Sequence, residues 1–297
     1  MDNYSHLHQD CIPKLEMNVD DRIQDIHKSR WIGYPAAQDA MHKMEGLLCH
    51  PRVSRMPNML LVGATNNGKT EIVKRFCQLH LPDESFDTEN LITPTMYFEA
   101  PPTPSEADFY THILCKLYER VPASSIAAKR ERTMSVLKRI ELKVMIIDEL
   151  HNILAGSSTK QQHFLNMIKY LSNQLQVSIV GCGTSDLLRA VSVDPQIQNR
   201  FPPTIIPRWK YNKSFRQLLS TFESVIPLKS RSSLHSPELS KKILAITEGS
   251  IGEISTLLNT AASYSLRNGR EFIDLESIQK CGYIGPGMRM RENVNAL

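Results

Sequence analysis

Short apolar runs alternate with segments of helical periodicity along the middle of this chain. Five runs have the length and character of buried strands: Met59–Val62, Met96–Phe98, Val144–Ile147, Val177–Val180 and Thr204–Ile206. Between them apolar residues recur three and four positions apart, as in amphipathic helices, over Ala36–Cys49, Lys69–His80, Ser105–Arg120, Ser124–Ile140 and Gln161–Gln174. This alternation predicts an α/β fold with a mostly parallel sheet covered by helices on both faces.

The strand pattern ends near Trp209, and only helical segments follow it. These are Asn212–Ser224, Ser236–Thr247, Ile251–Arg267 and Leu275–Lys280. The chain is therefore expected to have four parts: an extended N-terminal arm at 1–29 with a short helix near its end, an α/β domain at 30–207, a small helical lid domain at 208–280, and a C-terminal tail at 281–297.

The loop after the first predicted strand fits the pattern G-x-x-x-x-G-K-[ST]. Glycines at both ends allow the backbone N–H groups to surround phosphate oxygens at the positive end of the next helix. Lys69 would reach the β- and γ-phosphates of a nucleotide, and the Thr70 hydroxyl would ligate Mg²⁺. The candidate nucleotide-binding residues are Gly63, Ala64, Thr65, Asn66, Asn67, Gly68, Lys69, Thr70 and Glu71. The cofactors expected are ATP and Mg²⁺.

A second stretch, "VMIIDELHNIL", places Asp148 and Glu149 at the carboxyl end of a predicted strand, where open α/β sheets bind ligands. Asp148 would join Thr70 in the Mg²⁺ shell, and Glu149 would polarise a water molecule for attack on the γ-phosphate. His151 and Asn152 either hold this turn by hydrogen bonds or touch the nucleotide. About 80 residues after a phosphate loop, this Asp-Glu pair indicates an ATPase.

Two further candidates follow in order. "VSIVGCGTS" delivers Thr184, which could touch the γ-phosphate or the attacking water, or could cap the next helix with its neighbours. "DPQIQNRF" places Arg200 before another strand, where it either reaches a neighbouring subunit's ATP as a catalytic arginine finger or makes only structural contacts.

Composition narrows the setting. The 297 residues are 41% hydrophobic and 22% charged, as in a soluble globular protein, and the net charge of +4 permits contact with nucleic acid without requiring it. No apolar run approaches the length of a membrane span. The cysteines are scattered, as expected for reduced thiols in a bacterial cytoplasm, at positions Cys11, Cys49, Cys77, Cys115, Cys182 and Cys281.

The succession of phosphate loop, Asp-Glu strand, sensor strand, arginine and helical lid resembles an AAA+ P-loop ATPase over roughly residues 30–280. Within that class it resembles the TniB/TnsC family of transposition ATPases found in Tn5053/Tn402-like elements and related to MuB. The residues that carry this resemblance are "RWIGYP", "PNMLLVGATNNGKT", "IIDELHNILAGS", "QQHFLNMIKYLSNQLQVSIVGCGT", "DPQIQNRF" and "TEGSIGEI".

The resemblance implies an ATP-dependent regulator of DNA transposition, and slow hydrolysis of ATP is expected of it. It would form homo-oligomers, as a ring or helical filament, on double-stranded DNA, and this binding would be largely independent of the DNA sequence. It would recruit and activate a DDE transposase of the TniA/TnsB type and work with a TniQ-like targeting protein. Two loops align with DNA-contacting loops of the relatives without a shared motif, and they offer Thr103, Ser124, Ser125, Lys129 and Arg130.

One departure from the AAA+ pattern lies in the lid. Many lids carry an arginine where this chain reads Gly249-Ser250-Ile251-Gly252, so sensing of the γ-phosphate from the lid must be weak or achieved differently. The basic and aromatic stretch "IPRWKYNKSFR" suggests nucleic-acid binding, but a strand followed by a helix capped at Asn212 with packed aromatic residues is the favoured interpretation.

Two other functions compete with transposition. An AAA+ initiator or helicase-loader-type remodeller would use ATP to load another protein. Such proteins usually carry a winged-helix module after the lid, and only Cys281–Leu297 follow here. A nucleotide-locked scaffold would bind ATP with negligible hydrolysis, and the activity of Glu149 separates this alternative from the others.

Overall fold

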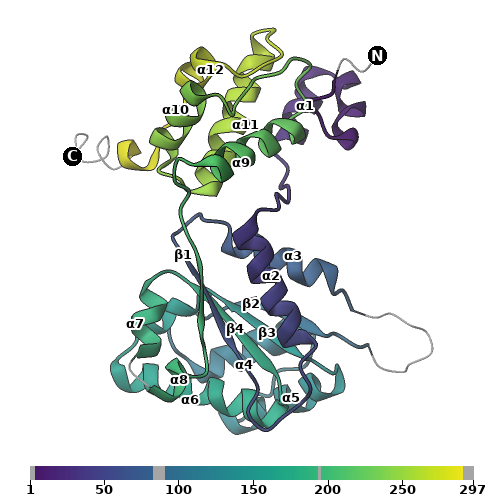
Figure 1. Cartoon of the computed structure of the whole chain (residues 1–297). Coiled ribbons are helices and arrows are strands. Elements are labelled where there is room, and N and C mark those ends of the chain that lie inside the picture. Colours follow the sequence, from purple (N-terminus) through teal and green to yellow (C-terminus); the bar gives the residue numbers. More distant parts are fainter. Residues whose placement is uncertain (1–3, 83–90, 193–194, 290–297) are drawn as a thin grey trace. The chain divides into compact units, whose positions relative to one another are not determined.

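The computed structural model describes residues 4–82, 91–192 and 195–289 (Figure 1). Asp194 of the "DPQIQNRF" stretch and residues 290–297 of the expected tail lie outside this range. The chain divides into two compact units. The α/β unit contains Pro35–Thr65 and Lys69–Pro207, and the helical unit contains the residues up to Tyr34, the loop residues Asn66–Gly68, and the chain from Arg208 onward.

The α/β unit is built on one five-stranded sheet with the order β2-β3-β4-β1-β5. All four neighbouring pairs are parallel, which confirms the predicted fold class. The strands are β1 (Met59–Gly63), β2 (Thr95–Glu99), β3 (Val144–Asp148), β4 (Ser178–Gly183) and β5 (Pro203–Ile206). Their parallel order places the carboxyl ends of β1, β3 and β4 at one edge of the sheet.

Helices cover both faces of this sheet (Figure 1). Leu60 and Val62 share a buried core with the helices that follow β2, β3 and β4. Leu61 between them is also fully buried and faces the other side, because successive strand residues alternate. The helices of the unit are α2 (Pro35–Leu48), α3 (Lys69–Leu79), α4 (Glu106–Lys116), α5 (Ile126–Arg139), α6 (Ser158–Leu175), α7 (Asp186–Ser192) and α8 (Pro195–Gln198).

The sequence pattern missed some of these boundaries. Helix α6 begins at Ser158, three residues before its predicted start, because the Ser157 side chain caps it by accepting from the Lys160 N–H. Helix α4 ends at Lys116, four residues before its predicted end at Arg120. The helix expected after Thr184 is α7, for which no bounds were predicted. The short helix α8 and the 3-10 helix η3 (Leu150–Ala155) were not predicted, since they are too short for a helical period to emerge.

The helical unit contains α1 (Val19–Ile26), α9 (Lys213–Val225), α10 (Pro237–Thr247), α11 (Ile251–Arg267) and α12 (Leu275–Lys280). The cap predicted at Asn212 is confirmed, because its side chain accepts from the Phe215 N–H at 2.9 Å. The aromatic residues of this stretch were expected to be packed, and Trp209 is: the centre of its ring lies 5.4 Å from that of Tyr34 and 6.2 Å from that of Phe215.

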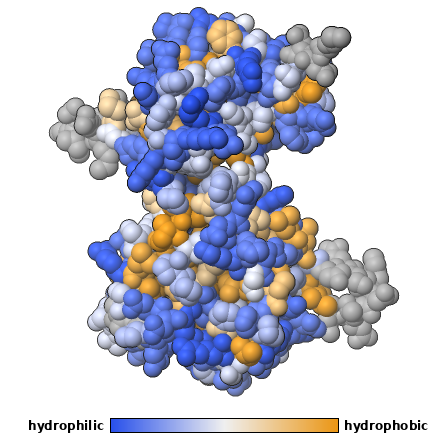
Figure 2. All heavy atoms as spheres, viewed as in Figure 1, coloured by the Kyte–Doolittle hydropathy of each residue, from blue (hydrophilic) through white to orange (hydrophobic). Residues whose placement is uncertain are grey.

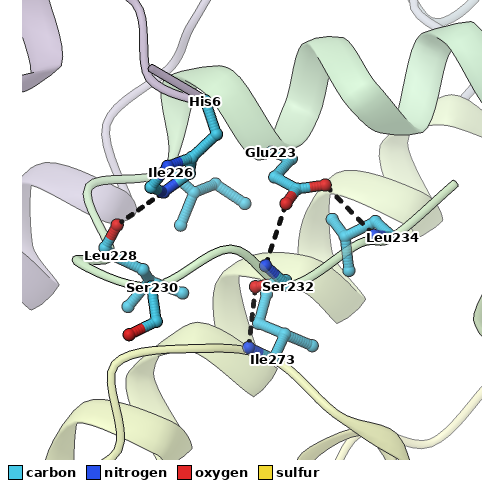
Figure 3. Close-up of a pocket in the computed structure, with 8 residues that line it drawn as sticks. All are labelled: His6, Glu223, Ile226, Leu228, Ser230, Ser232, Leu234 and Ile273. Atoms are coloured by element: carbon cyan, nitrogen blue, oxygen red, sulfur yellow. Dashed lines mark hydrogen bonds between the residues drawn. The ribbon is translucent and has the colours of Figure 1, made fainter. Parts of the chain in front are cut away.

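The N-terminal arm is not extended, contrary to expectation. It forms two 3-10 turns, η1 (Gln9–Cys11) and η2 (Pro13–Glu16), before α1, and Leu7, Cys11 and Leu15 make a small buried cluster. Figure 3 shows His6 beside the loop after α9, where the Leu228 carbonyl lies 3.1 Å from its Nε2. In the same pocket the Glu223 carboxylate accepts the N–H groups of Ser232 and Leu234. The arm is thus fixed to the helical unit by buried contacts that its polar sequence does not reveal.

No helix in the described ranges is both long enough and apolar enough to cross a membrane. Hydrophilic side chains cover most of the helical unit on the face that Figure 2 shows, with apolar residues interspersed. The strongly apolar segments are the strands, and every residue of β1, β3 and β4 is buried.

Candidate functional site

The phosphate loop begins where β1 ends. A Cβ on Gly63 would lie 3.0 Å from the Ile206 carbonyl oxygen, so the tight packing of β1 against β5 favours glycine there. Lys69 opens α3 and is largely buried; its ammonium group donates to the carbonyl oxygens of Gly63 at 3.0 Å and Ala64 at 2.9 Å. Its side chain therefore folds back along the loop that it serves. Burial lowers the pKa of Lys69, while Glu149 and Asp148 oppose this shift.

Two residues of the loop adopt left-handed backbone conformations, Asn66 with φ of 56° and Gly68 with φ of 80°. Asparagine and glycine are the residue types that enter this region most readily. The left-handed residues reverse the direction of the backbone N–H groups, which is how such loops present several donors to an anion. The geometry fits the nucleotide-binding role predicted for Gly63–Thr70.

A carboxylate and a hydroxyl meet at the carboxyl edge of the sheet. Asp148, which is 1% exposed at the end of β3, accepts a 2.6 Å hydrogen bond from the Thr70 hydroxyl. Its other oxygen accepts the Glu149 N–H at 2.9 Å. Hydroxyl and carboxylate oxygens are the ligands that Mg²⁺ takes when nucleotide phosphates supply the rest of its shell. Among the described residues there is no group of three or more His, Cys, Asp or Glu side chains that could hold a metal.

Glu149 follows in a left-handed conformation with φ of 52°, which turns the chain sharply into η3. Its side chain is 45% exposed, and its carboxylate lies 3.3 Å from the His151 Nε2. The Asn152 N–H donates to the Glu149 carbonyl at 2.9 Å. Of the two roles considered for His151 and Asn152, these contacts fit the one in which both residues hold the turn. Asp148 is thus buried and fixed, whereas Glu149 is open to solvent and able to meet a water molecule.

Two site residues carry no signal in the sequence. The Tyr97 hydroxyl on β2 donates to Asp148 at 3.2 Å, and burial, followed by Asp148, raises the Tyr97 pKa. Cys182 on β4 is fully buried, and burial, again followed by Asp148, raises its pKa well above the usual value. Finding them would have required the strand order, which pairs Glu99 of β2 with Asp148 of β3. Both side chains add to the enclosed environment around Asp148.

With this geometry established, comparison with known proteins decides the family. The family described as bacterial TniB protein matches residues 22–211, well over half of the chain. The chain belongs to the TniB family. The family match and the geometry of the site fit the ATPase motifs read from the sequence. None of the curated proteins shows a significant match to the sequence.

Solved structures share the fold of this TniB-family chain. The ORC1 protein of Aeropyrum pernix, solved in complex with DNA, is 19% identical, with a TM-score of 0.59 over 83% of this chain and 63% of that one. CDC6P from Pyrobaculum aerophilum is 14% identical, with a TM-score of 0.60 over 87% and 70% of the two chains. Domain III of Thermotoga maritima DnaA is 12% identical, with a TM-score of 0.52 over 93% and 97%. The chain spans less than two thirds of the ORC1 protein's length, and at these identities only the fold is shared.

The remaining candidates of this TniB-family chain lie away from the Asp148 cluster or have partners within the chain. The Thr184 hydroxyl, just after β4, donates to Asp186 at 3.4 Å. Arg200 donates to the Asn173 side-chain oxygen at 2.9 Å, near the end of α6, and its Nε is buried with no hydrogen-bond partner among the described residues. Burial, and then the nearby Arg55, lower the pKa of Arg200.

The candidate DNA-contacting residues border α4 and α5. Ser125 caps α5 by accepting the Ala128 N–H at 3.1 Å, and the Lys129 ammonium donates to the Thr111 hydroxyl at 3.1 Å. Arg130 forms a 2.6 Å ion pair with Glu106, which neutralises its charge. Thr103 and Ser124 are exposed. Of the two basic candidates, Lys129 carries a charge that no carboxylate offsets in a described ion pair.

Proposed function

We propose that this chain is an ATP-dependent, DNA-binding regulator of DNA transposition. In this proposal it oligomerises on target DNA as a ring or helical filament and recruits and activates a DDE transposase of the TniA/TnsB type. A TniQ-like protein would direct it to the target. The match to the TniB family over residues 22–211 supports the transposition setting.

The observation that carries the oligomer is the position of Arg200. The phosphate loop follows β1, whereas Arg200 comes before β5, and these two strands are parallel with Leu60 opposite Pro203 and Gly63 opposite Ile206. The loop and Arg200 therefore belong to opposite ends of adjacent strands. At about 3.3 Å per residue these ends are roughly 10 Å or more apart. In this proposal Arg200 therefore acts on the phosphate loop of a second copy rather than on that of its own chain.

Hydrolysis would use residues at the carboxyl edge of the sheet. Lys69 would bind the β- and γ-phosphates in place of the loop carbonyls that it contacts, and Thr70 and Asp148 would hold Mg²⁺. The metal, when bound, would neutralise charge that develops on the phosphates. Glu149 accepts a proton from the attacking water and orients it, because its exposed carboxylate has room for that water beside His151. Thr184, held by Asp186, would contact the γ-phosphate or the same water.

The test of this function is DNA binding by the full chain with ATP, with ADP and without nucleotide, followed by addition of the DDE transposase. We expect ATP to drive assembly of many subunits on duplex DNA of any sequence. Affinity should fall steeply with salt, because each subunit adds contacts to the phosphate backbone. Only the ATP-bound assembly should retain the transposase and stimulate strand transfer. Equal DNA and transposase binding in ATP and ADP would contradict the proposal.

An initiator or helicase-loader-type remodeller remains the second candidate, because the ORC1, CDC6P and DnaA structures share this fold. It predicts a different result in the same assay. A loader would leave strand transfer unchanged and instead deposit a helicase on DNA in an ATP-dependent step.

A further inference from the structure

The tip of the phosphate loop is held by the first turn of α11. The Ser250 hydroxyl and the Gly252 N–H both donate to the Asn66 carbonyl oxygen, at 2.6 Å and 3.0 Å. A Cβ on Gly252 would lie only 2.0 Å from the Asn66 side-chain oxygen. The Asn66 side chain in turn donates to the Glu253 carboxylate at 2.9 Å. Asn66 is one of the two left-handed residues that shape the loop, so these contacts fix the loop's most demanding conformation.

Glu253 also receives two side chains from the segment after α12. Arg289 donates to both carboxylate oxygens, at 2.8 Å and 3.2 Å, and the Tyr283 hydroxyl donates to one of them. The Arg289 guanidinium lies 5.5 Å from the centre of the Tyr283 ring. Glu253 is 7% exposed. The same carboxylate therefore links the loop tip to residues 283–289.

Residues 283–289 pack closely against the helical unit. A Cβ on Gly285 would lie 2.3 Å from the Ile246 carbonyl oxygen of α10. The Arg289 Nε donates to the Ile284 carbonyl at 2.8 Å, which orients the guanidinium towards Glu253. The basic partner of Glu253 therefore comes from this segment, because the first turn of α11 carries no basic residue of its own.

The charge of Glu253 makes Arg289 necessary. Burial alone would raise the pKa of Glu253, but hydrogen bonds from Arg289, Tyr283 and Asn66 hold it below the usual value. The carboxylate is therefore ionised at neutral pH. An uncompensated negative charge bonded to the loop tip would repel the phosphates that the loop binds, with little solvent to screen it. Arg289 cancels that charge while leaving Glu253 free to hold Asn66.

We propose that Arg289 and Tyr283 are positioning residues of the nucleotide site, which hold Glu253 as a neutralised anchor for Asn66. The segment 283–289 is then part of the nucleotide-binding apparatus, and its docking and nucleotide binding favour one another. This inference rests on phosphate binding by the loop. It also explains how a lid without an arginine after Gly249 can still respond to nucleotide.

The first test compares ATP affinity in the full chain and in three variants. Arg289→Ala should weaken ATP binding about tenfold, the effect of losing one charge-assisted contact. The double variant Arg289→Ala/Glu253→Gln should recover most of that loss, because glutamine keeps an acceptor for Asn66 and removes the charge. Arg270→Ala is the matched control, since it breaks an exposed Arg–Glu pair of the same unit that has no bond to the loop, and it should bind ATP normally.

Wild-type affinity for ATP in Arg289→Ala would overturn the inference, and so would a double variant that binds ATP as weakly as the single one.

The second test follows hydrogen exchange of the amides of residues 283–289. ATP should slow their exchange in the wild type and have no effect in Lys69→Ala. If wild-type protein binds ATP without any change in this segment, the coupling is absent even though the nucleotide site stands. If Lys69→Ala binds ATP as well as wild type, the loop itself is wrongly assigned.

Discussion

At the carboxyl edge of the sheet, Thr70 and Asp148 are joined by a 2.6 Å hydrogen bond and Lys69 is fixed to the loop carbonyls. Arg200 precedes β5 and so lies where the parallel strands begin, which we call the amino edge. In the described hydrogen bonds it contacts only neutral groups, the Asn173 amide and the Ser172 hydroxyl. In the proposed function the first edge binds the nucleotide with residues of a single chain. The second holds a cation that is not part of the site described at the carboxyl edge. The difference suggests that one chain can bind ATP but that efficient hydrolysis requires two.

The largest effect should come from the amino edge. Arg200→Ala should lower ATP turnover of the DNA-bound assembly about 10³-fold or more, as loss of a catalytic arginine does. ATP binding by the isolated chain should stay within a few-fold of wild type, because the phosphate loop lies at the other edge. Arg139→Ala, which removes an exposed arginine paired with Glu119, is the control. Normal turnover in Arg200→Ala would assign that residue a structural role only.

Glu149→Gln should reduce turnover about 10²-fold or more, because the amide cannot accept a proton from water. ATP binding should persist, and the DNA complex should last longer. Glu99→Gln is a demanding control, since Glu99 pairs with Asp148 across β2 and β3 and ends at the same edge. In a phosphate-release assay, Glu149→Gln should be slow and Glu99→Gln should be close to wild type. A near-normal rate of phosphate release in Glu149→Gln would mean that another group accepts the proton from the attacking water.

Lys69→Ala should weaken ATP binding about 10²-fold, the combined loss of two charge-assisted contacts to phosphate. Lys74→Ala, on the exposed face of the same helix, should bind normally. Calorimetric titration with ATP measures both. A folded Lys69→Ala protein with unchanged affinity would refute the binding site at the carboxyl edge.

The smallest effect concerns Tyr97. Tyr97→Phe removes one hydrogen bond to Asp148 while the Thr70 bond remains. We expect the Mg²⁺ concentration for half-maximal activity to shift about fivefold, the equivalent of one ordinary hydrogen bond. Tyr170→Phe, on the exposed side of α6, should not shift it. An unchanged Mg²⁺ dependence in Tyr97→Phe would remove Tyr97 from the site.

The carboxyl edge could be predicted because its chemistry is local in sequence. Gly63–Thr70 lie in one loop, and Asp148 and Glu149 end one apolar run, so motif and strand pattern identify the same residues. Burial of whole strands made the sheet equally clear. Tyr97 could not be predicted, because its proximity to Asp148 depends on which strands are neighbours.

The helical unit shows the opposite case. Its helices α11 and α12 were predicted with the boundaries that the structure has, since their apolar faces are long and regular. The contacts of Glu253 with Arg289 and Asn66 were not, because they join residues 36 and 187 positions apart with no motif between them. The folded structure of the N-terminal arm was not predicted for a similar reason. Leu7, Cys11 and Leu15 show no helical or strand period, and their burial depends on residues distant in the sequence, such as Val225.

The most direct test of the two-edge account mixes Arg200→Ala with Lys69→Ala subunits on DNA. The first variant retains an intact carboxyl edge and the second an intact amino edge. If Arg200 acts on a neighbouring chain, the mixture should recover ATPase activity that neither variant shows alone, with a maximum near equal proportions. Activity that stays at the level of the separate variants at every ratio, in assemblies shown to contain both, would contradict the account.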